Sequence, residues 1–180
     1  MKNFFIVHGT FGNSKENWFG WLENILVNKG YDVYNFNYPT PEGHNFENWA
    51  KVLNQVKNKI SNESVFICHS SAPIFIIKYC LTYNIKIGKL ISVSGANNFL
   101  VGNPIFDDIN KHMFVEDVSK FKSLCAKRIC FYSKNDPYIS FIALKDFAKS
   151  IEAEEIIVDN AGHFNKEYGF TEFKEIINYL

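Results

Sequence analysis

Two hydrophobic patterns alternate along this chain. Short runs of apolar and β-branched residues, typical of strands buried on both faces, begin at Asn3, Val65, Lys89 and Lys127. Longer stretches between them repeat apolar residues every three or four positions, which is the period of an amphipathic helix. The alternation predicts strands and helices that follow one another along the chain.

The two patterns assign residue ranges to these elements. The expected strands cover 3–8, 31–38, 65–69, 89–94, 127–132 and 154–158. The expected helices cover 14–29, with Ser14 as cap and Gly30 closing it, and then 46–60, 72–83, 138–150 and 170–180. Residues 99–118 have the least regular pattern. This order predicts a single α/β domain over 1–180, a three-layer sandwich with a central parallel sheet of about six strands.

Composition narrows the class of protein. The 180 residues, 47% of them hydrophobic and 21% charged, fit one compact domain with a sizeable core. The formal net charge is zero, so we expect no affinity for nucleic acid or for a membrane surface. The apolar run before His8 is too short for a signal peptide or a membrane span, which predicts a cytoplasmic protein. Nothing in the composition indicates an oligomeric state.

Cysteine and histidine spacing argues against metal and disulfide chemistry. The four cysteines form no CxxC pair, so we expect buried, reduced thiols. No HxH or HExxH spacing links the five histidines, and we expect no metal. The loop from Gly9 to Gly12 matches neither GxGxxG nor a Walker sequence, so no nucleotide cofactor is expected either.

The polar residues that follow the expected strands hold the candidate chemistry. Working residues of parallel sheets gather at the carboxyl ends of the strands. Those ends fall here at 8–11, 69–71, 95–98, 133–136 and 159–163. They include Ser70, Asp136 and His163, in that chain order.

Ser70 is the candidate nucleophile because a strand passes directly into a helix at VFICHSSAPIFIIKY. In such an elbow the serine hydroxyl stands clear of the backbone, and the N–H groups that open the helix face its target. Ser70 occupies the middle of CHSSA, and Ser71 would offer its backbone N–H to an oxyanion. The alternative is that Ser70 only caps the helix and Ser71 only belongs to its first turn.

His163 is the candidate base and Asp136 the acid that orients it. The order Ser, Asp, His is the one found in α/β-hydrolases. Asp136 before Pro137 is also typical of a helix cap, and His163 beside a glycine could be an ordinary loop residue. We expect His8 and His69 to be packed, with ring nitrogens bonded to backbone.

The loop after the first strand is expected to supply the second oxyanion donor. The backbone N–H of Thr10 is the first choice and that of Phe11 the reserve. Aromatic residues over 99–114, Phe99 and Phe106 among them, would form a shallow, uncharged substrate wall with Phe11 and Trp18. This predicts a small apolar or aromatic acyl group as substrate.

Four segments together carry a family resemblance. They are HGTFGNSKENWFGWL, FICHSSAPIFIIKY, FYSKNDPYIS and DNAGHF. In this order and spacing the chain resembles, over nearly its full length, the small α/β-hydrolases of the retinoblastoma-binding protein 9 and YdeN type. The resemblance implies a minimal α/β-hydrolase fold without a large lid domain, and a Ser70, His163 and Asp136 triad. It also implies carboxylesterase- or amidase-like activity on small esters or amides without a cofactor.

The elbow departs from the family pattern at two positions. Cys68 and Ala72 stand where family members commonly have glycine, and these positions must be small because strand and helix approach closely there. The departure keeps a second hypothesis open, a weak or inactive α/β-hydrolase-fold protein that serves as a binding module. A thiol mechanism through Cys68 is a third alternative.

Overall fold

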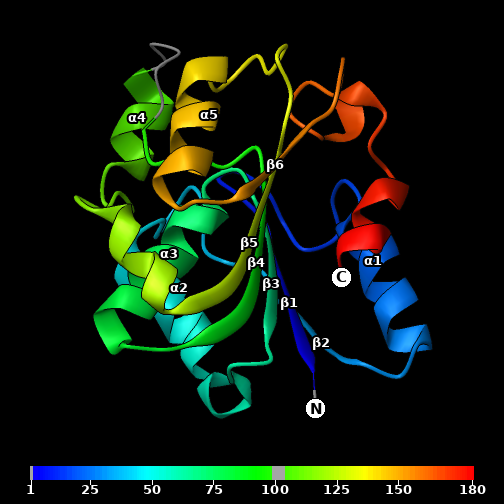
Figure 1. Ribbon diagram of the computed structural model, residues 1–180, viewed down its shortest axis with the longest axis vertical. Helices are drawn as coiled ribbons and strands as arrows, with labels where there is room; N and C mark the ends of the chain where they lie inside the picture. The colour runs from blue at the N-terminus through cyan, green and yellow to red at the C-terminus, as the bar shows by residue number, and fades with distance from the viewer. Residues whose placement is uncertain (1, 99–103) are drawn as a thin grey trace.

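The protein is built around one parallel sheet. The computed structural model describes residues 2–98 and 104–180 (Figure 1). The strands are β1 (Asn3–Val7), β2 (Asp32–Asn35), β3 (Val65–His69), β4 (Ile87–Val93), β5 (Cys125–Tyr132) and β6 (Glu154–Ile157). They are ordered β2-β1-β3-β4-β5-β6, and every neighbouring pair is parallel. The carboxyl ends of the strands therefore meet at one edge of the sheet.

Helices cover both faces of this sheet. They are α1 (Phe19–Asn28), α2 (Phe46–Asn54), α3 (Ala72–Tyr83), α4 (Pro104–Asn110) and α5 (Phe141–Ser150). Short 3₁₀ helices lie at Lys57–Lys59, Val118–Ser123, Lys166–Tyr168 and Lys174–Tyr179. In Figure 1, α2, α3 and α5 lie on one side of the sheet, and α1 lies with the C-terminal segment on the other. The predicted three-layer sandwich is confirmed.

Each face of the sheet has its own core. Neighbouring residues of a strand point to opposite faces, so Phe4 packs toward α1 and Phe5 toward α2 and α3. Helix α3 is buried on nearly all sides, which explains why its sequence is almost uniformly apolar. Because β1 and β3 are buried on both faces, their carboxyl ends have fixed positions for the loops that follow.

Four expected helices end or begin elsewhere, among them α5, which begins at Phe141 and not at residue 138. Helix α1 begins at Phe19, so Ser14 as its cap is wrong: the N–H of Ser14 donates to Asn37 Oδ1 at 2.8 Å in a preceding turn. Helix α2 ends at Asn54, well before residue 60. The expected α-helix over 170–180 is a 3₁₀ turn instead. Its inward residues Phe173, Ile176 and Tyr179 are spaced by three, which places them on one side of a 3₁₀ helix.

The close approach of α3 to β4 yields a stability prediction. A Cβ atom on Gly95 would lie 2.2 Å from Ser92 Oγ and 2.7 Å from Pro73 Cγ. We expect Gly95→Ala to lower the free energy of unfolding by about 1–3 kcal/mol, since the rigid proline ring cannot move aside. The measurement is urea denaturation followed by tryptophan fluorescence.

Gly20 supplies the matched control for this substitution. It lies in α1 with nothing within 4 Å of its Cβ position. Gly20→Ala should leave the free energy of unfolding unchanged or raise it by up to about 1 kcal/mol, because alanine favours the helix. Equal stability of the two variants would contradict the packing argument.

Candidate active site

The junction between β3 and α3 holds Ser70 in a strained conformation. Its φ angle is 59°, in the left-handed region, and its N–H donates to Val93 O at 2.9 Å. Such a conformation costs about 1–3 kcal/mol in a non-glycine residue and needs support from its surroundings. Part of this support is Gly9: a Cβ there would lie 2.5 Å from Ser70 Cβ. The loop after β1 therefore packs directly against the elbow.

Cys68 and Ala72 are accommodated at this elbow. Both are fully buried, and helix α3 begins at Ala72 directly after Ser71. The Cys68 side chain belongs to the core under α2 and α3 and does not line the cavity that Ser70 faces. Burial and the neighbouring Cys80 raise the pKa of its thiol. All four cysteines are free and buried, as the sequence predicts.

Asp136 and His163 form a buried hydrogen-bonded pair. His163 Nδ1 lies 2.7 Å from Asp136 Oδ2, and the aspartate side chain is fully inaccessible to solvent. Burial pushes the pKa of Asp136 upward, but the hydrogen bond and charge of His163 outweigh it, so the pKa lies below its usual value. A carboxylate only accepts hydrogen bonds, so His163 Nδ1 carries the proton and Nε2 is left to act as a base.

The helix-cap alternative for Asp136 is resolved by its second oxygen. Oδ1 accepts hydrogen bonds from the N–H groups of Tyr138 at 2.9 Å and Ile139 at 3.1 Å. Helix α5 itself begins later, at Phe141, and Ser140 caps it. Asp136 thus stabilises the turn before the helix with one oxygen and binds His163 with the other.

His69 fixes the position of the His163 loop. Its Nε2 donates to the backbone oxygen of His163 at 2.7 Å, and the two rings are 4.8 Å apart. Trp18 Nε1 donates to Phe164 O at 3.0 Å, and the N–H of Gly162 donates to Asn135 Oδ1 at 3.0 Å. The candidate base is therefore anchored by hydrogen bonds at three successive residues.

His8 is a packed histidine of the kind the sequence predicts. Its Nδ1 donates to Gly9 O at 2.8 Å, and its Nε2 accepts the N–H of Tyr38 at 2.8 Å. Burial lowers its pKa, so the ring stays neutral. His8 and His69 both make the backbone hydrogen bonds expected of them.

The predicted oxyanion donors lie beside Ser70. The N–H of Thr10 donates to Ser71 Oγ at 3.0 Å, which brings the loop after β1 and the start of α3 together. The reserve donor, Phe11, gives its N–H to Thr40 Oγ1 at 2.9 Å. Without substrate, both candidate oxyanion donors in this loop are therefore hydrogen-bonded to side-chain hydroxyls, Thr10 to Ser71 and Phe11 to Thr40.

A cavity of about 1000 Å³ opens over Ser70 and His163. Phe11 and Phe106 line it, with ring centroids 5.3 Å apart, as the sequence predicts. Trp18 is fully buried beneath it and is not part of its lining, so that prediction is wrong. Phe99 lies outside the described residues.

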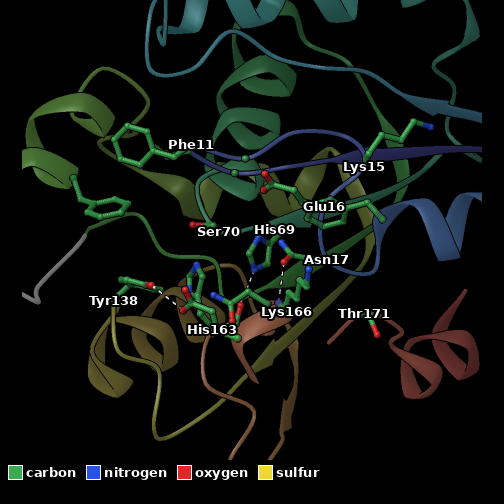
Figure 2. Close-up of a pocket in the computed structure, with 17 residues that line it drawn as sticks. Phe11, Lys15, Glu16, Asn17, His69, Ser70, Tyr138, His163, Lys166 and Thr171 are labelled. Atoms are coloured by element: carbon green, nitrogen blue, oxygen red, sulfur yellow. Dashed lines mark hydrogen bonds between the residues drawn. The ribbon is translucent and has the colours of Figure 1, made fainter. Parts of the chain in front are cut away.

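The wall of the cavity is not uncharged, contrary to the prediction. Figure 2 shows Phe11 and Tyr138 on one side of Ser70 and several polar side chains on the other. These polar lining residues are Lys15, Glu16, Asn17, Lys166, Glu167 and Thr171. They come from the segments after β1 and β6. Their position after the carboxyl ends of two strands was the sequence signal that could have placed them near the site.

Within residues 2–98 and 104–180, no group of three or more histidine, cysteine, aspartate or glutamate side chains is placed to bind a metal ion. The same residues include no helix of the length and apolarity needed to cross a membrane.

Comparison with known proteins gives one family for this chain. The model of a family described as serine hydrolase matches residues 4–180. YdeN of Bacillus subtilis strain 168 is 27% identical over 181 residues, covering 99% of this chain and 94% of YdeN. The crystal structure of the B. subtilis ydeN gene product has a TM-score of 0.89 at 26% identity, covering 99% of this chain and 96% of that one.

A solved structure of lower sequence identity shares the architecture. The monoacylglycerol lipase of Paleococcus ferrophilus has a TM-score of 0.71 at 15% identity, covering 98% of this chain and 93% of the lipase. The fold is that of the α/β-hydrolases, and the described residues contain no large lid.

The buried histidines predict how stability depends on pH. Burial, followed by the nearby His163, lowers the pKa of His69 to about 3, and burial lowers that of His44 to about 4. The unfolded chain protonates each of them near pH 6.5, so it binds more protons than the folded protein below that pH. The free energy of unfolding should therefore fall by up to about 1.4 kcal/mol per pH unit for each histidine as pH drops from 6.5 toward 4.

His69→Gln isolates the contribution of His69. Glutamine can still donate to His163 O but does not titrate, so the slope between pH 6 and 4.5 should shrink by about one proton. Urea denaturation at several pH values measures the slope. His112 is exposed, and His112→Gln is the matched control for replacing a histidine outside the core. An unchanged slope in His69→Gln would show that His69 titrates equally in both states.

Proposed function

Since this chain belongs to the serine hydrolase family, we propose that it cleaves small esters or amides through an acyl-enzyme intermediate on Ser70. The observation that carries the proposal is the buried Asp136 and His163 pair, whose histidine lines the same cavity as a strained serine at a strand-to-helix elbow. Strained residues and buried charged pairs cluster at sites of chemistry. The four segments HGTFGNSKENWFGWL, FICHSSAPIFIIKY, FYSKNDPYIS and DNAGHF also support a proposed kinship with hydrolases of the retinoblastoma-binding protein 9 type.

Acylation follows from the roles of the three side chains. Ser70 Oγ attacks the carbonyl carbon of the substrate while His163 Nε2 takes its proton. Asp136 holds the imidazole in the required tautomer and stabilises the imidazolium that forms. The carbonyl oxygen becomes an oxyanion, which the N–H groups of Ser71 and Thr10 bind. His163 then protonates the alcohol or amine as it leaves.

Deacylation repeats these steps with water as the nucleophile. His163 takes a proton from water, the hydroxide attacks the acyl carbon, and the carboxylic acid leaves as Ser70 regains its proton. The aromatic side of the cavity, with Phe11, Phe106 and Tyr138, suits the acyl group. The polar side, with Lys15 and Lys166, suits a hydrophilic leaving group. We place this activity in the cytoplasm, where free cysteines such as those of this chain persist.

Active-site labelling tests the nucleophile. We expect a fluorophosphonate probe to label the wild type and Cys68→Ala equally, and Ser70→Ala to lose the label, because the probe phosphonylates an activated serine. In-gel fluorescence of the purified proteins measures this. Undiminished labelling of Ser70→Ala would refute the assignment. If the wild type neither takes up label nor turns over p-nitrophenyl acetate, a binding module becomes the better interpretation.

The orienting role of Asp136 predicts a large loss of rate. Asp136→Asn keeps the size of the side chain but lets Nδ2 donate to His163, which favours the wrong imidazole tautomer. We expect kcat for p-nitrophenyl acetate to fall by about 10³- to 10⁴-fold while KM stays within about twofold. Asp146 is exposed on α5, and Asp146→Asn is the matched control with wild-type kcat. A fall of less than about tenfold in Asp136→Asn would show that His163 is oriented by other contacts.

A further inference from the structure

A chain of buried polar side chains runs from the elbow into two distant loops. Thr10 Oγ1 lies 2.9 Å from Ser71 Oγ and 2.7 Å from Asn110 Oδ1. His44 Nε2 lies 3.1 Å from the same Asn110 oxygen. Ser71 and Asn110 are fully buried, and His44 is 6% exposed. The chain joins the loops after β1 and β2 and the end of α4 to the first turn of α3.

The hydrogen-bond directions in this network follow from the chemistry of its members. Asn110 Nδ2 donates to Phe106 O at 2.9 Å, which leaves Oδ1 to face Thr10 and His44 as an acceptor. The Thr10 hydroxyl has a single proton, and its shortest contact is to this oxygen, which can only accept. The contact between the two hydroxyls is then donated by Ser71. Asn110 thereby sets the direction of both hydroxyl groups.

His44 holds the asparagine from the other side. Burial lowers its pKa to about 4, so the ring is neutral at pH 7, and its contact with Asn110 Oδ1 requires the proton on Nε2. Its Nδ1 has no hydrogen-bond partner among the described residues. The ring packs against Trp49 with centroids 4.8 Å apart, which limits its rotation. The Asn110 oxygen thus receives two donors from fixed directions.

We propose that Asn110, held by His44, is a positioning residue for the oxyanion hole. It fixes the Thr10 and Ser71 hydroxyls and so keeps the N–H of Thr10 beside the N–H of Ser71. The inference rests on the proposed function, since it concerns the donors that would bind the oxyanion. Oxyanion donors act only when they are held near 3 Å from the developing charge.

Two contacts join Thr10 to Ser71, so the N–H of Thr10 can leave one of them for an oxyanion while the other holds the loop in position. In the free protein Ser71 Oγ accepts the N–H of Thr10 at 3.0 Å. When an oxyanion forms, this N–H turns to the stronger, charged acceptor. The second contact, in which Ser71 donates to the Thr10 hydroxyl, remains and keeps the loop in place. Removing the Thr10 hydroxyl or its partner Asn110 would release the loop.

Two substitutions at Thr10 separate the hydroxyl from the backbone donor. Thr10→Val has the same shape without the hydroxyl, and Thr10→Ser keeps it. We expect Thr10→Val to lower kcat for p-nitrophenyl acetate at least about tenfold with KM within twofold, since oxyanion contacts act in the transition state. Thr10→Ser should stay within about threefold of wild type. Thr82 is exposed on α3, and Thr82→Val is the control with unchanged kcat.

Asn110→Leu tests whether the network acts as one unit. Alone it should lower kcat by a similar factor, and combined with Thr10→Val it should add little, because both changes break the same path. Affinity for an aryl trifluoromethyl ketone, which forms a tetrahedral adduct with a catalytic serine, should fall in parallel with kcat/KM across the series. A role in folding alone would lower the melting temperature of a variant without this proportional loss.

The outcomes separate this inference from the proposed function. Wild-type protein that takes the fluorophosphonate label, with unchanged kcat in Thr10→Val and Asn110→Leu, would overturn the positioning role and leave the serine hydrolase intact. Additive losses, or equal losses in Thr10→Val and Thr10→Ser, would also overturn it. A wild type that fails to label or turn over would remove the proposed function, and with it this inference.

Discussion

The left-handed conformation of Ser70 is the constraint that organises the molecule. A backbone φ of 59° is unfavourable for a residue with a side chain. The surrounding residues must therefore prevent the backbone of Ser70 from returning to a negative φ. Three features do this: the fully buried β3 before it, the fully buried start of α3 after it, and Gly9 packed against its Cβ. The strain is confined to one residue because both flanking elements are fixed by the core. Ser70 is consequently held in the lining of the cavity.

The parallel sheet brings the remaining parts to this point. The loops after β1, β5 and β6 leave the same edge, and each contributes one member of the site: Thr10, Asp136 and His163. None of these loops is held by backbone strand pairing. The first and the last are fixed by buried polar side chains instead, Ser71 for the loop after β1 and His69 for the loop after β6. The site thus includes hydrogen bonds that cross between elements as well as the pair of Asp136 and His163.

The sequence predicts the parts of this arrangement that are local. Strands β1 and β3, helix α3 and the elbow follow from runs of apolar residues, and the candidate triad follows from the rule that parallel strands end at a common edge. The 3₁₀ turn at the C-terminus was missed because Phe173 and Ile176 satisfy helical and 3₁₀ spacing almost equally well. Asn110 was missed because its partners, Thr10 and His44, are far away in the chain and no local pattern marks them. The charged side of the cavity was missed although its residues follow β1 and β6, because the sequence does not show which loop side chains turn toward Ser70.

Histidine chemistry shows why tertiary contacts decide function here. His8, His44 and His69 are all buried and have lowered pKa values. Each donates its ring N–H to a backbone carbonyl or side-chain amide oxygen. His163 alone among the described histidines faces a carboxylate. That difference comes from Asp136, whose second oxygen is held by backbone N–H groups so that the first is aimed at the ring. One buried charge, placed by a turn, therefore distinguishes the candidate base from three structural histidines of the same residue type.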